Sequence, residues 1–188
     1  MYILFEGIDS CGKSTQIELI KKEHKEVLIT KEPYSTTFRD ILLGGELESK
    51  RAEILLFLAD RAEHYHKVIK PNPDRLILSD RGFISGMAYA LANGKFNKEE
   101  LLSFNKFALQ GAMPDKIILF ITDMPTLKSR ISTMKLDSIE KRGLEYLLEV
   151  QDIMKDIIIS LNVPHLFVDA TDDIDSINKI ITDYIKRT

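Results

Sequence analysis

Short apolar runs along the chain alternate with longer segments in which apolar residues recur every three or four positions. The short runs predict buried strands, and the longer segments predict amphipathic helices. The expected strands are Tyr2–Phe5, Val27–Thr30, Leu76–Leu78, Lys116–Thr122 and Leu166–Val168. The expected helices are Lys13–His24, Phe38–Leu43, Lys50–Lys70, Ile84–Ala92, Lys98–Gln110, Thr126–Met134, a long one ending near Leu161, and Ile174–Lys186.

Five buried strands separated by helices predict an α/β fold of three layers, in which a parallel sheet is covered by helices on both faces. Sheets of this kind bind ligands beyond the carboxyl ends of their strands. We therefore expect the functional residues to lie in the segments that follow the strands.

The length and composition are those of one globular domain spanning residues 1–188. Of the 188 residues, 44% are hydrophobic, which is enough to bury a core without disulfides or metal. The 29 acidic and 26 basic residues give a net charge of −3, so we do not expect a nucleic-acid partner, which normally requires a basic excess. A single cysteine, Cys11, excludes an intrachain disulfide framework and fits a reducing, cytoplasmic location. No apolar run approaches the ~18 residues that span a bilayer, so no membrane partner is expected either.

One segment matches a phosphate-binding loop in full. Residues 7–14 read Gly-Ile-Asp-Ser-Cys-Gly-Lys-Ser and follow a predicted strand and precede a predicted helix, which a chance glycine-rich turn would not require. The glycines let the backbone curl so that its N–H groups point into one concavity, and the helix N-terminus adds partial positive charge. Lys13 is expected to reach the β- and γ-phosphates of a nucleotide, and the Ser14 hydroxyl is expected to bind Mg²⁺. The candidate nucleotide-binding residues are Gly7, Ile8, Asp9, Ser10, Cys11, Gly12, Lys13, Ser14 and Thr15.

Two side chains within this loop have alternative interpretations. A carboxylate at Asp9 would repel phosphates unless Mg²⁺ or a cationic side chain lies nearby, and the alternative is an ordinary solvated loop acid. Cys11 is interpreted as a small filler residue rather than as a redox site.

A second candidate site follows the strand Leu76–Leu78, where the chain continues as Ser79, Asp80 and Arg81. Beside a phosphate-binding loop, the Asp80 carboxylate can hold Mg²⁺ or its waters, and the planar fork of Arg81 can bind a phosphate through two hydrogen bonds. The alternative is an Asp–Arg pair at the surface, but the phosphate-binding loop on another strand favours the first interpretation. The histidines His64 and His66 fall on opposite sides of a predicted helix without evident partners, so a metal site there is not expected.

With these motifs in place, the chain resembles the thymidylate kinase family of nucleoside monophosphate kinases over nearly its whole length. The matching segments, in order, are Phe5–Asp9 leading into the loop, Thr30–Pro33, Leu56–Arg61, Asp80–Tyr89, Met113–Asp115 and Asp169–Thr171. The resemblance implies a P-loop kinase fold with a short lid at about residues 129–141. It implies ATP and Mg²⁺ as cofactors, thymidine monophosphate as acceptor, and a homodimer packed through helices.

The resemblance also implies roles for individual side chains. Phe57 and Arg61 are four residues apart and share a helix face, where they would stack on thymine and donate to a base carbonyl, although Phe57 also fits an apolar core position. Tyr89 would lie against the acceptor sugar, and Arg81 would bind the acceptor phosphate. Asp9 would lie near that sugar and the metal. The remaining implied contacts are Glu32, Pro33, Arg39 and Ser85 on the acceptor side, and Ala170 beside the adenine.

Several positions depart from the family pattern. Gly86 stands where relatives often carry a polar residue facing the base, and Gly82 replaces an aromatic residue or histidine. The phosphate-binding loop lacks the arginine that some relatives carry, so the catalytic cations are expected in the lid, which offers Arg130 and Lys135. The expected catalytic set is therefore Lys13, Arg81, Asp9, Arg130 and Lys135, with Ser14 and Asp80 on the metal.

The expected reaction is direct transfer of the γ-phosphoryl group of ATP to thymidine monophosphate, as part of dTTP synthesis. Two alternatives remain open from the sequence. One is a P-loop kinase for another small acceptor, and the other is a nucleotide-dependent switch, although the Asn-Lys-x-Asp motif of guanine-binding switches does not occur.

Overall fold

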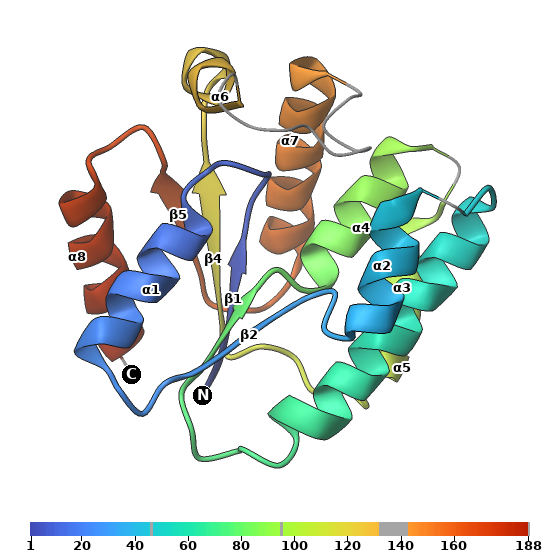
Figure 1. The fold of residues 1–188 in the computed structure, drawn as a ribbon, viewed down its shortest axis with the longest axis horizontal. Coiled ribbons are helices and arrows are strands. Elements are labelled where there is room, and N and C mark those ends of the chain that lie inside the picture. The colour runs from blue at the N-terminus through green and yellow to red at the C-terminus, as the bar shows by residue number, and fades with distance from the viewer. Residues whose placement is uncertain (46, 95, 132–142, 188) are drawn as a thin grey trace.

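A computed structural model describes residues 1–45, 47–94, 96–131 and 143–187. Its centre is a sheet of five parallel strands in the order β2-β3-β1-β4-β5 (Figure 1). The strands are β1 (Tyr2–Glu6), β2 (Leu28–Lys31), β3 (Ile77–Asp80), β4 (Lys116–Ile121) and β5 (His165–Asp169). All neighbouring strands pair in parallel, which confirms the α/β architecture predicted from the alternation of apolar runs and amphipathic segments.

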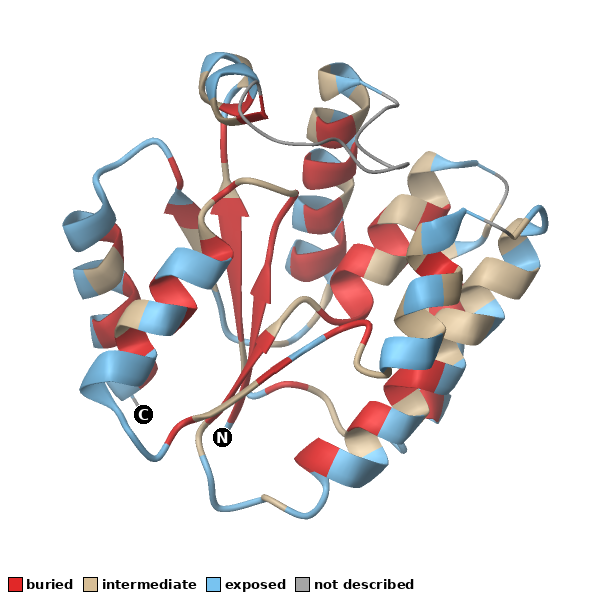
Figure 2. Ribbon diagram, viewed as in Figure 1, coloured by how far each residue is buried: buried red, intermediate tan, exposed pale blue. Residues whose placement is uncertain are grey.

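Helices cover both faces of this sheet. On one side lie α1 (Lys13–Glu23) and α8 (Ile174–Lys186), and on the other lie α4 (Phe83–Ala92) and α7 (Leu144–Ser160) (Figure 1). Beyond α4 are α2 (Thr36–Gly44), α3 (Lys50–His64) and α5 (Lys98–Ala108), while α6 (Met124–Ile131) follows β4. The central strands are therefore buried between two layers of helices (Figure 2).

Strand side chains alternate between two separate cores. In β1, Leu4 joins the core under α4 and α7, whereas Ile3 and Phe5 join the core under α1 and α8. Ile117 and Ile118 of β4 divide between the two cores in the same way. Because the strands are apolar on both faces, their sequences read as continuous hydrophobic runs instead of alternating ones.

Side-chain caps fix where several helices begin. The Ser35 hydroxyl accepts a hydrogen bond from the Phe38 N–H at 3.4 Å, so α2 begins at Thr36 and not at Phe38 as expected. Asn97 accepts from the Glu100 N–H at 2.9 Å before α5. Asp173 accepts from the Ser176 N–H at 2.9 Å before α8, whose bounds agree with the prediction.

The helix expected over Lys50–Lys70 changes its winding partway. The α-helix ends at His64 and continues as a wider π-turn, η1 (Tyr65–Ile69), in which the Lys70 N–H donates to the Tyr65 carbonyl at 2.9 Å. This turn buries the adjacent residues Val68 and Ile69 together. Apolar residues at regular α-helical spacing do not predict this change from an α-helix to a π-turn.

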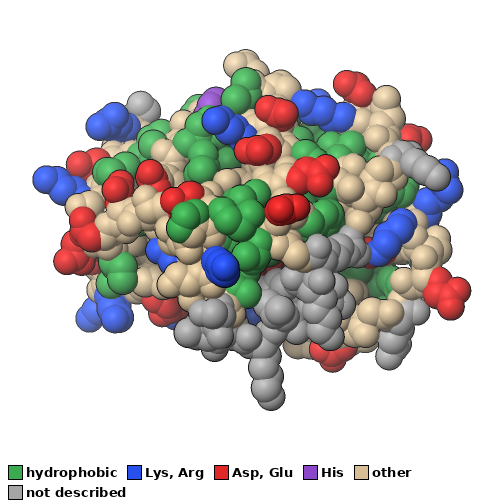
Figure 3. Space-filling view, turned by 90° about the horizontal axis from the view of Figure 1, so that it is seen from above, with side chains coloured by type: hydrophobic (Ala, Val, Ile, Leu, Met, Phe, Trp, Pro, Cys, Tyr) green, Lys and Arg blue, Asp and Glu red, His purple; other side chains and the backbone are tan. Residues whose placement is uncertain are grey.

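The carboxyl ends of the strands lie at the top of Figure 1, and Figure 3 views the molecule from that side. Acidic, basic and hydrophobic side chains are interspersed on this face, in keeping with the near balance of charges in the sequence (Figure 3). Most of the expected lid, Lys135 included, lies outside the described residues. Across the described ranges, no helix combines the length and the apolar character that crossing a membrane would need.

Candidate functional site

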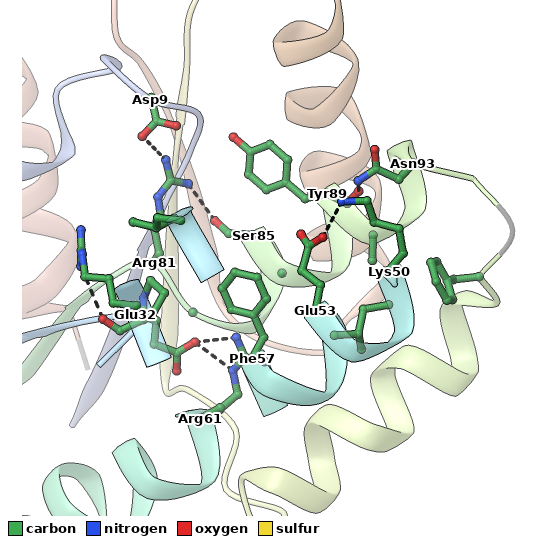
Figure 4. Close-up of a pocket in the computed structure, with 18 residues that line it drawn as sticks. Asp9, Glu32, Lys50, Glu53, Phe57, Arg61, Arg81, Ser85, Tyr89 and Asn93 are labelled. Atoms are coloured by element: carbon green, nitrogen blue, oxygen red, sulfur yellow. Dashed lines mark hydrogen bonds and ion pairs between the residues drawn. The ribbon is translucent and has the colours of Figure 1, made fainter. Parts of the chain in front are cut away.

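Two adjoining pockets open at the carboxyl end of the sheet. One, the loop pocket, is lined by residues 9–16 with Arg130 and Ala170. The other, the helix pocket, lies between α3 and α4 (Figure 4). Four side chains line both pockets, namely Asp9, Glu32, Arg39 and Arg81. Such a shared boundary is where groups bound in the two pockets would meet.

The loop pocket is shaped by the backbone between β1 and α1. Gly7 has a φ of +143°, and a Cβ there would come within 2.8 Å of Cys11 Sγ and 2.9 Å of the Phe120 carbonyl oxygen. Only glycine fits this conformation and this space. The Lys13 ammonium donates to the carbonyls of Gly7 at 2.9 Å and Ile8 at 2.8 Å. The loop therefore curls around its own lysine.

A hydroxyl and a carboxylate face each other on the wall of the loop pocket. Ser14 Oγ donates to Asp80 Oδ2 at 2.9 Å. These hard oxygen ligands suit Mg²⁺, which usually takes one or two protein ligands and completes its shell with phosphate and water oxygens. Among the residues that the structure describes, no group of three or more His, Cys, Asp or Glu side chains could hold a metal alone. The residues present therefore fit a Mg²⁺ ion that arrives with a nucleotide.

Arg130, at the end of α6, closes the far side of the loop pocket. Its Nη1 donates to the Ser10 carbonyl at 3.2 Å and its Nη2 to the Ala170 carbonyl at 2.7 Å. These bonds connect three segments that are distant in the sequence. Of the two cations expected in the lid, Arg130 thus lies at the pocket, and Lys135 is outside the described residues.

Arg81 stands at the junction of the two pockets. Its φ of 72° is unusual for a residue with a side chain, a strain that functional sites often retain. Nη1 donates to the Gly7 carbonyl at 2.8 Å. Nη1 also donates to Ser85 Oγ at 3.1 Å, and Nη2 donates to Asp9 Oδ1 at 2.6 Å (Figure 4). Burial alone would raise the pKa of the Asp9 carboxyl, but the charges of Arg81 and Lys13 outweigh it and hold this pKa below its ordinary value. Asp9 therefore has the cationic partner that its place in a phosphate-binding loop requires.

The floor of the helix pocket is a buried ion pair. Arg61 of α3 is 2% exposed, and its Nε and Nη2 donate to Glu32 Oε2 at 2.9 and 2.5 Å (Figure 4). Its Nη1 donates to Asn105 Oδ1 of α5 at 2.5 Å. Burial would raise the pKa of the Glu32 carboxyl, but Arg61 and the hydrogen bond from His64 hold it below its ordinary value. Glu32 thus fixes Arg61 in place from behind.

His64 extends this network into the core, which corrects the expectation that it lacks partners. The ring is fully buried, with Nδ1 3.1 Å from Glu32 Oε1 and Nε2 2.7 Å from Thr30 Oγ1. It also stacks on Tyr34 with ring centroids 5.1 Å apart. The available sequence signal was its spacing of three from Arg61, which places both on one helix face.

Asp60 anchors the segment that follows β2. Its carboxylate accepts from the backbone N–H groups of Tyr34 at 2.6 Å and Ser35 at 2.7 Å. It thereby ties α3 to the loop that carries Pro33 into the helix pocket. The matching segment Leu56–Arg61 contained Asp60, but nothing in the sequence indicated what it holds.

A buried carboxylate below Arg81 was missed from the sequence, because Glu6 reads only as the end of a strand. Glu6 is fully buried, and its Oε2 accepts from Ser85 Oγ at 2.5 Å. Since Ser85 accepts from Arg81, the three form a chain of hydrogen bonds directed from Arg81 to Glu6. Burial raises the pKa of Glu6 from 4.5 to about 7, against the opposing effects of the Ser85 hydrogen bond and the Arg81 charge.

The structure brings most of the expected site residues together. The expected residues that line the loop pocket are Asp9, Ser10, Cys11, Gly12, Lys13, Ser14, Thr15, Glu32, Arg39, Asp80, Arg81, Arg130 and Ala170. Those that line the helix pocket are Asp9, Glu32, Pro33, Arg39, Phe57, Arg61, Arg81, Ser85 and Tyr89. Gly7 and Ile8 line neither pocket, and their carbonyls hold Lys13 instead. Phe57 lies on the wall of the helix pocket, facing Tyr89 across it (Figure 4).

Comparison with known proteins agrees with this geometry. The sequence model of the family described as thymidylate kinase matches residues 5–181. A thymidylate kinase from Sulfurovum sp. (strain NBC37-1) is 60% identical over 99% of this chain and 100% of its own length. One from Campylobacter curvus (strain 525.92) is 54% identical over the same shares of the two chains. The crystal structure of thymidylate kinase from Ehrlichia chaffeensis, at 24% identity, superposes with a TM-score of 0.76 over 100% of this chain and 98% of that one, which shows a shared fold.

Proposed function

The chain belongs to the thymidylate kinase family, and from its geometry we propose that the loop pocket binds ATP and the helix pocket binds thymidine monophosphate. The reaction is that of the family, in which ATP phosphorylates thymidine monophosphate to thymidine diphosphate. The observation that carries the assignment of the pockets is their shared boundary, where Asp9 and Arg81 contribute to both. The γ-phosphoryl group and the acceptor phosphate would meet there.

The helix pocket suits a pyrimidine nucleotide. Phe57 and Tyr89 offer aromatic surface for the base and the sugar, and Arg61 at the floor offers hydrogen-bond donors for the base edge. Arg81 and Arg39 at the boundary offer positive charge for the phosphate. Pro33 and Ser85 also line this pocket.

Transfer between two phosphates depends on positioning and charge stabilisation. Arg81 holds the acceptor phosphate in line, while Lys13 and Arg130 offset the charge that builds on the γ-phosphoryl group. The acceptor phosphate is itself an anionic nucleophile, so the chain needs no general base. Asp9 orients Arg81 across the boundary through their 2.6 Å contact.

Ser14 and Asp80 would hold Mg²⁺ in the loop pocket, in keeping with their adjacent oxygens. When bound, Mg²⁺ neutralises charge on the β- and γ-phosphates. Asp80 lies at the end of β3, and β3 pairs with β1 in the sheet. Its carboxylate is therefore close to the phosphate-binding loop, which follows β1.

A panel of acceptors tests this function. ADP formation is measured with ATP, Mg²⁺ and thymidylate, uridylate, deoxycytidylate, thymidine or no acceptor. We expect ADP and thymidine diphosphate in equal amounts with thymidylate, and at least ~10²-fold lower kcat/KM with deoxycytidylate. A preference for thymidine, or ADP formation that does not depend on any acceptor, would assign the pockets differently.

For the quaternary structure we propose a homodimer that buries the outer face of α3 and α5. Leu55 on α3 is 64% exposed, and Phe104 and Phe107 on α5 are 43% and 86% exposed. α3 and α5 pack against each other, and exposed large apolar side chains are typical of interfaces. Light scattering after size exclusion should give twice the chain mass for the wild type and the chain mass for Phe107→Asp. A monomeric wild type would overturn this proposal.

A further inference from the structure

Glu6, at the end of β1, is a fully buried carboxylate that the proposed transfer does not use. A Cβ on Gly82 would lie 3.5 Å from Glu6 Oε1, so the backbone that follows Arg81 lies close to this oxygen. Oε1 has no hydrogen-bond partner among the residues that the structure describes. A carboxylate in such surroundings costs stability, which an amide or an apolar side chain would avoid. The reason for a carboxylate here must therefore lie in what its other oxygen contacts.

The other oxygen, Oε2, accepts from Ser85 of α4. Ser85 Oγ donates to Glu6 Oε2 at 2.5 Å, and Arg81 Nη1 donates to Ser85 Oγ at 3.1 Å. A hydroxyl carries a single proton. Because that proton points at Glu6, the lone pairs of Ser85 Oγ are left to accept from Arg81. The direction of both hydrogen bonds therefore depends on Glu6 being an acceptor.

A proton on Glu6 would disturb this arrangement. On Oε2 it would turn the carboxyl into a donor toward Ser85, so the serine proton would lose its acceptor. On Oε1 the added proton would itself lack an acceptor within the described part of the chain. In either form, the negative charge that acts on the Arg81 guanidinium through Ser85 would be gone. The carboxylate is thus the form of Glu6 that holds Arg81.

We propose that Glu6 is a positioning residue for the transfer, because its carboxylate orients the Ser85 hydroxyl and thereby fixes Nη1 of Arg81. This inference rests on the proposed function, in which Arg81 holds the acceptor phosphate. Asp9 fixes the second terminal nitrogen, Nη2, at 2.6 Å. With a carboxylate acting on each terminal nitrogen, the guanidinium plane keeps one orientation at the boundary of the two pockets.

The groups around Glu6 set the pH range in which this positioning changes. Burial and one neighbouring acid, Glu32 after β2, raise the pKa of Glu6 to about 7 against the groups that favour its carboxylate, namely Ser85, Arg81 and Lys13. Tyr2 lies on the same strand, and burial raises the pKa of its phenol above the ordinary value, so it stays neutral. Glu6 is therefore mostly ionised above about pH 7 and mostly protonated below it.

The test compares kcat/KM for thymidylate between the wild type and Glu6→Gln from pH 6 to pH 8.5. Glutamine keeps the size and an oxygen acceptor but cannot carry the charge. We expect the wild type to be at least ~5-fold faster at pH 8.5, where it has a hydrogen bond to an ionised group, and less than about twofold faster at pH 6. The acceptor phosphate also titrates, near pH ~6, and cancels in this ratio because both proteins receive the same substrate. The KM for ATP should differ by less than about twofold, since Glu6 lines neither pocket.

Further measurements separate positioning from a general effect on the fold. Ser85→Ala cuts the same chain of hydrogen bonds, so the ratio of wild type to Ser85→Ala should also rise with pH. Adding Glu6→Gln to Ser85→Ala should lower kcat/KM at pH 8.5 by less than about twofold more, since both changes break one chain. The midpoint of thermal unfolding of Glu6→Gln at pH 8.5 should equal or exceed that of the wild type, because a buried charge is removed. Glu63→Gln, which removes an exposed carboxylate from α3, is the matched control and should give a ratio that does not change with pH.

The outcomes separate this inference from the function on which it rests. A wild type that does not phosphorylate thymidylate overturns the proposed function. A wild type that does, with a ratio to Glu6→Gln that stays constant with pH or a Ser85→Ala variant that keeps full activity at pH 8.5, overturns the inference alone. A lower unfolding midpoint of Glu6→Gln, or an equal rise in the KM for ATP, would also overturn it, because either would indicate a general distortion of the site.

Discussion

The two pockets of this molecule are built in different ways. The loop pocket is built around one continuous stretch of backbone, residues 9–16, whose conformation is set by glycines and by Lys13. The helix pocket is formed by side chains from the loop after β2, from α2, α3 and α4, held by buried charges such as Glu32 and Arg61. The first should tolerate changes of those side chains that bind neither phosphate nor Mg²⁺, while the second should be selective for its ligand and sensitive to single substitutions.

Arg81 lines both pockets, so replacing it should have the largest effect on activity. Arg81 holds the acceptor phosphate at the point of transfer, and an arginine at that point contributes on the order of 10³- to 10⁵-fold to the rate. We expect Arg81→Ala to lower kcat/KM for thymidylate by about that factor in steady-state assays. Arg81→Lys keeps the positive charge but lacks the planar guanidinium, so its kcat/KM should lie between those of the wild type and Arg81→Ala. A loss below ~10-fold for Arg81→Ala would mean that the boundary is not where transfer takes place.

The helix pocket should lose stability when its ion pair is broken. Arg61→Ala leaves the Glu32 carboxylate buried without its guanidinium, which costs about 3–5 kcal/mol of unfolding free energy. Denaturant unfolding measures the loss. The double variant Arg61→Ala, Glu32→Gln removes the unpaired carboxylate charge and should recover part of the lost unfolding free energy. If Arg61→Ala cost less than ~1 kcal/mol, the pocket would not depend on buried charge.

The carboxyl of Glu6 should make stability depend on pH. Its folded pKa of about 7 lies above its ordinary 4.5, so the folded chain holds a proton that the unfolded chain releases, and stability falls as pH rises from 4.5 to 7. Arg81 and Lys13 limit the rise in pKa, whereas Glu32 adds to it.

Glu6→Gln should remove this decline, which amounts to about 3 kcal/mol across the window. Unfolding free energies of wild type and variant, measured between pH 4.5 and 8, give the difference directly. If the unfolding free energies of the two proteins changed with pH in the same way, Glu6 would be ionised over this whole pH range.

The smallest effect is expected in the loop pocket. Cys11 is buried in the loop, 1% exposed, but the pocket is shaped by the backbone on either side of it. Cys11→Ala should change the KM for ATP by less than about threefold, and the loss of stability should be about 1 kcal/mol. A tenfold rise in that KM would show that side chains shape this pocket as well.

The same contrast explains what could be predicted from the sequence. The loop of residues 7–14 and the strands were predictable because their signals are local, a fixed spacing of glycine and lysine in one case and apolar runs in the other. The bounds of α8 agreed because a strong apolar periodicity and the Asp173 cap coincide.

The side chains that line the helix pocket, and those that hold them from behind, were only partly predictable. Phe57 and Arg61 were found through their resemblance to a family, but Glu6, His64 and Asn105 acquire their partners only when β1, α3 and α5 pack. The Asn105–Arg61 contact joins residues 44 apart in the sequence. The π-turn after His64 and the start of α2 were missed because the packing of Val68 and Ile69 and the hydroxyl of Ser35 set them.

The central claim is that the helix pocket recognises thymidylate independently of ATP binding in the loop pocket. Calorimetric titration of Arg61→Lys with thymidylate and with a non-hydrolysable ATP analogue tests it most directly, since lysine keeps a charge near Glu32 but lacks the fork. The account predicts that thymidylate affinity falls at least ~10-fold while affinity for the ATP analogue changes less than about twofold. Equal losses for both nucleotides would contradict it.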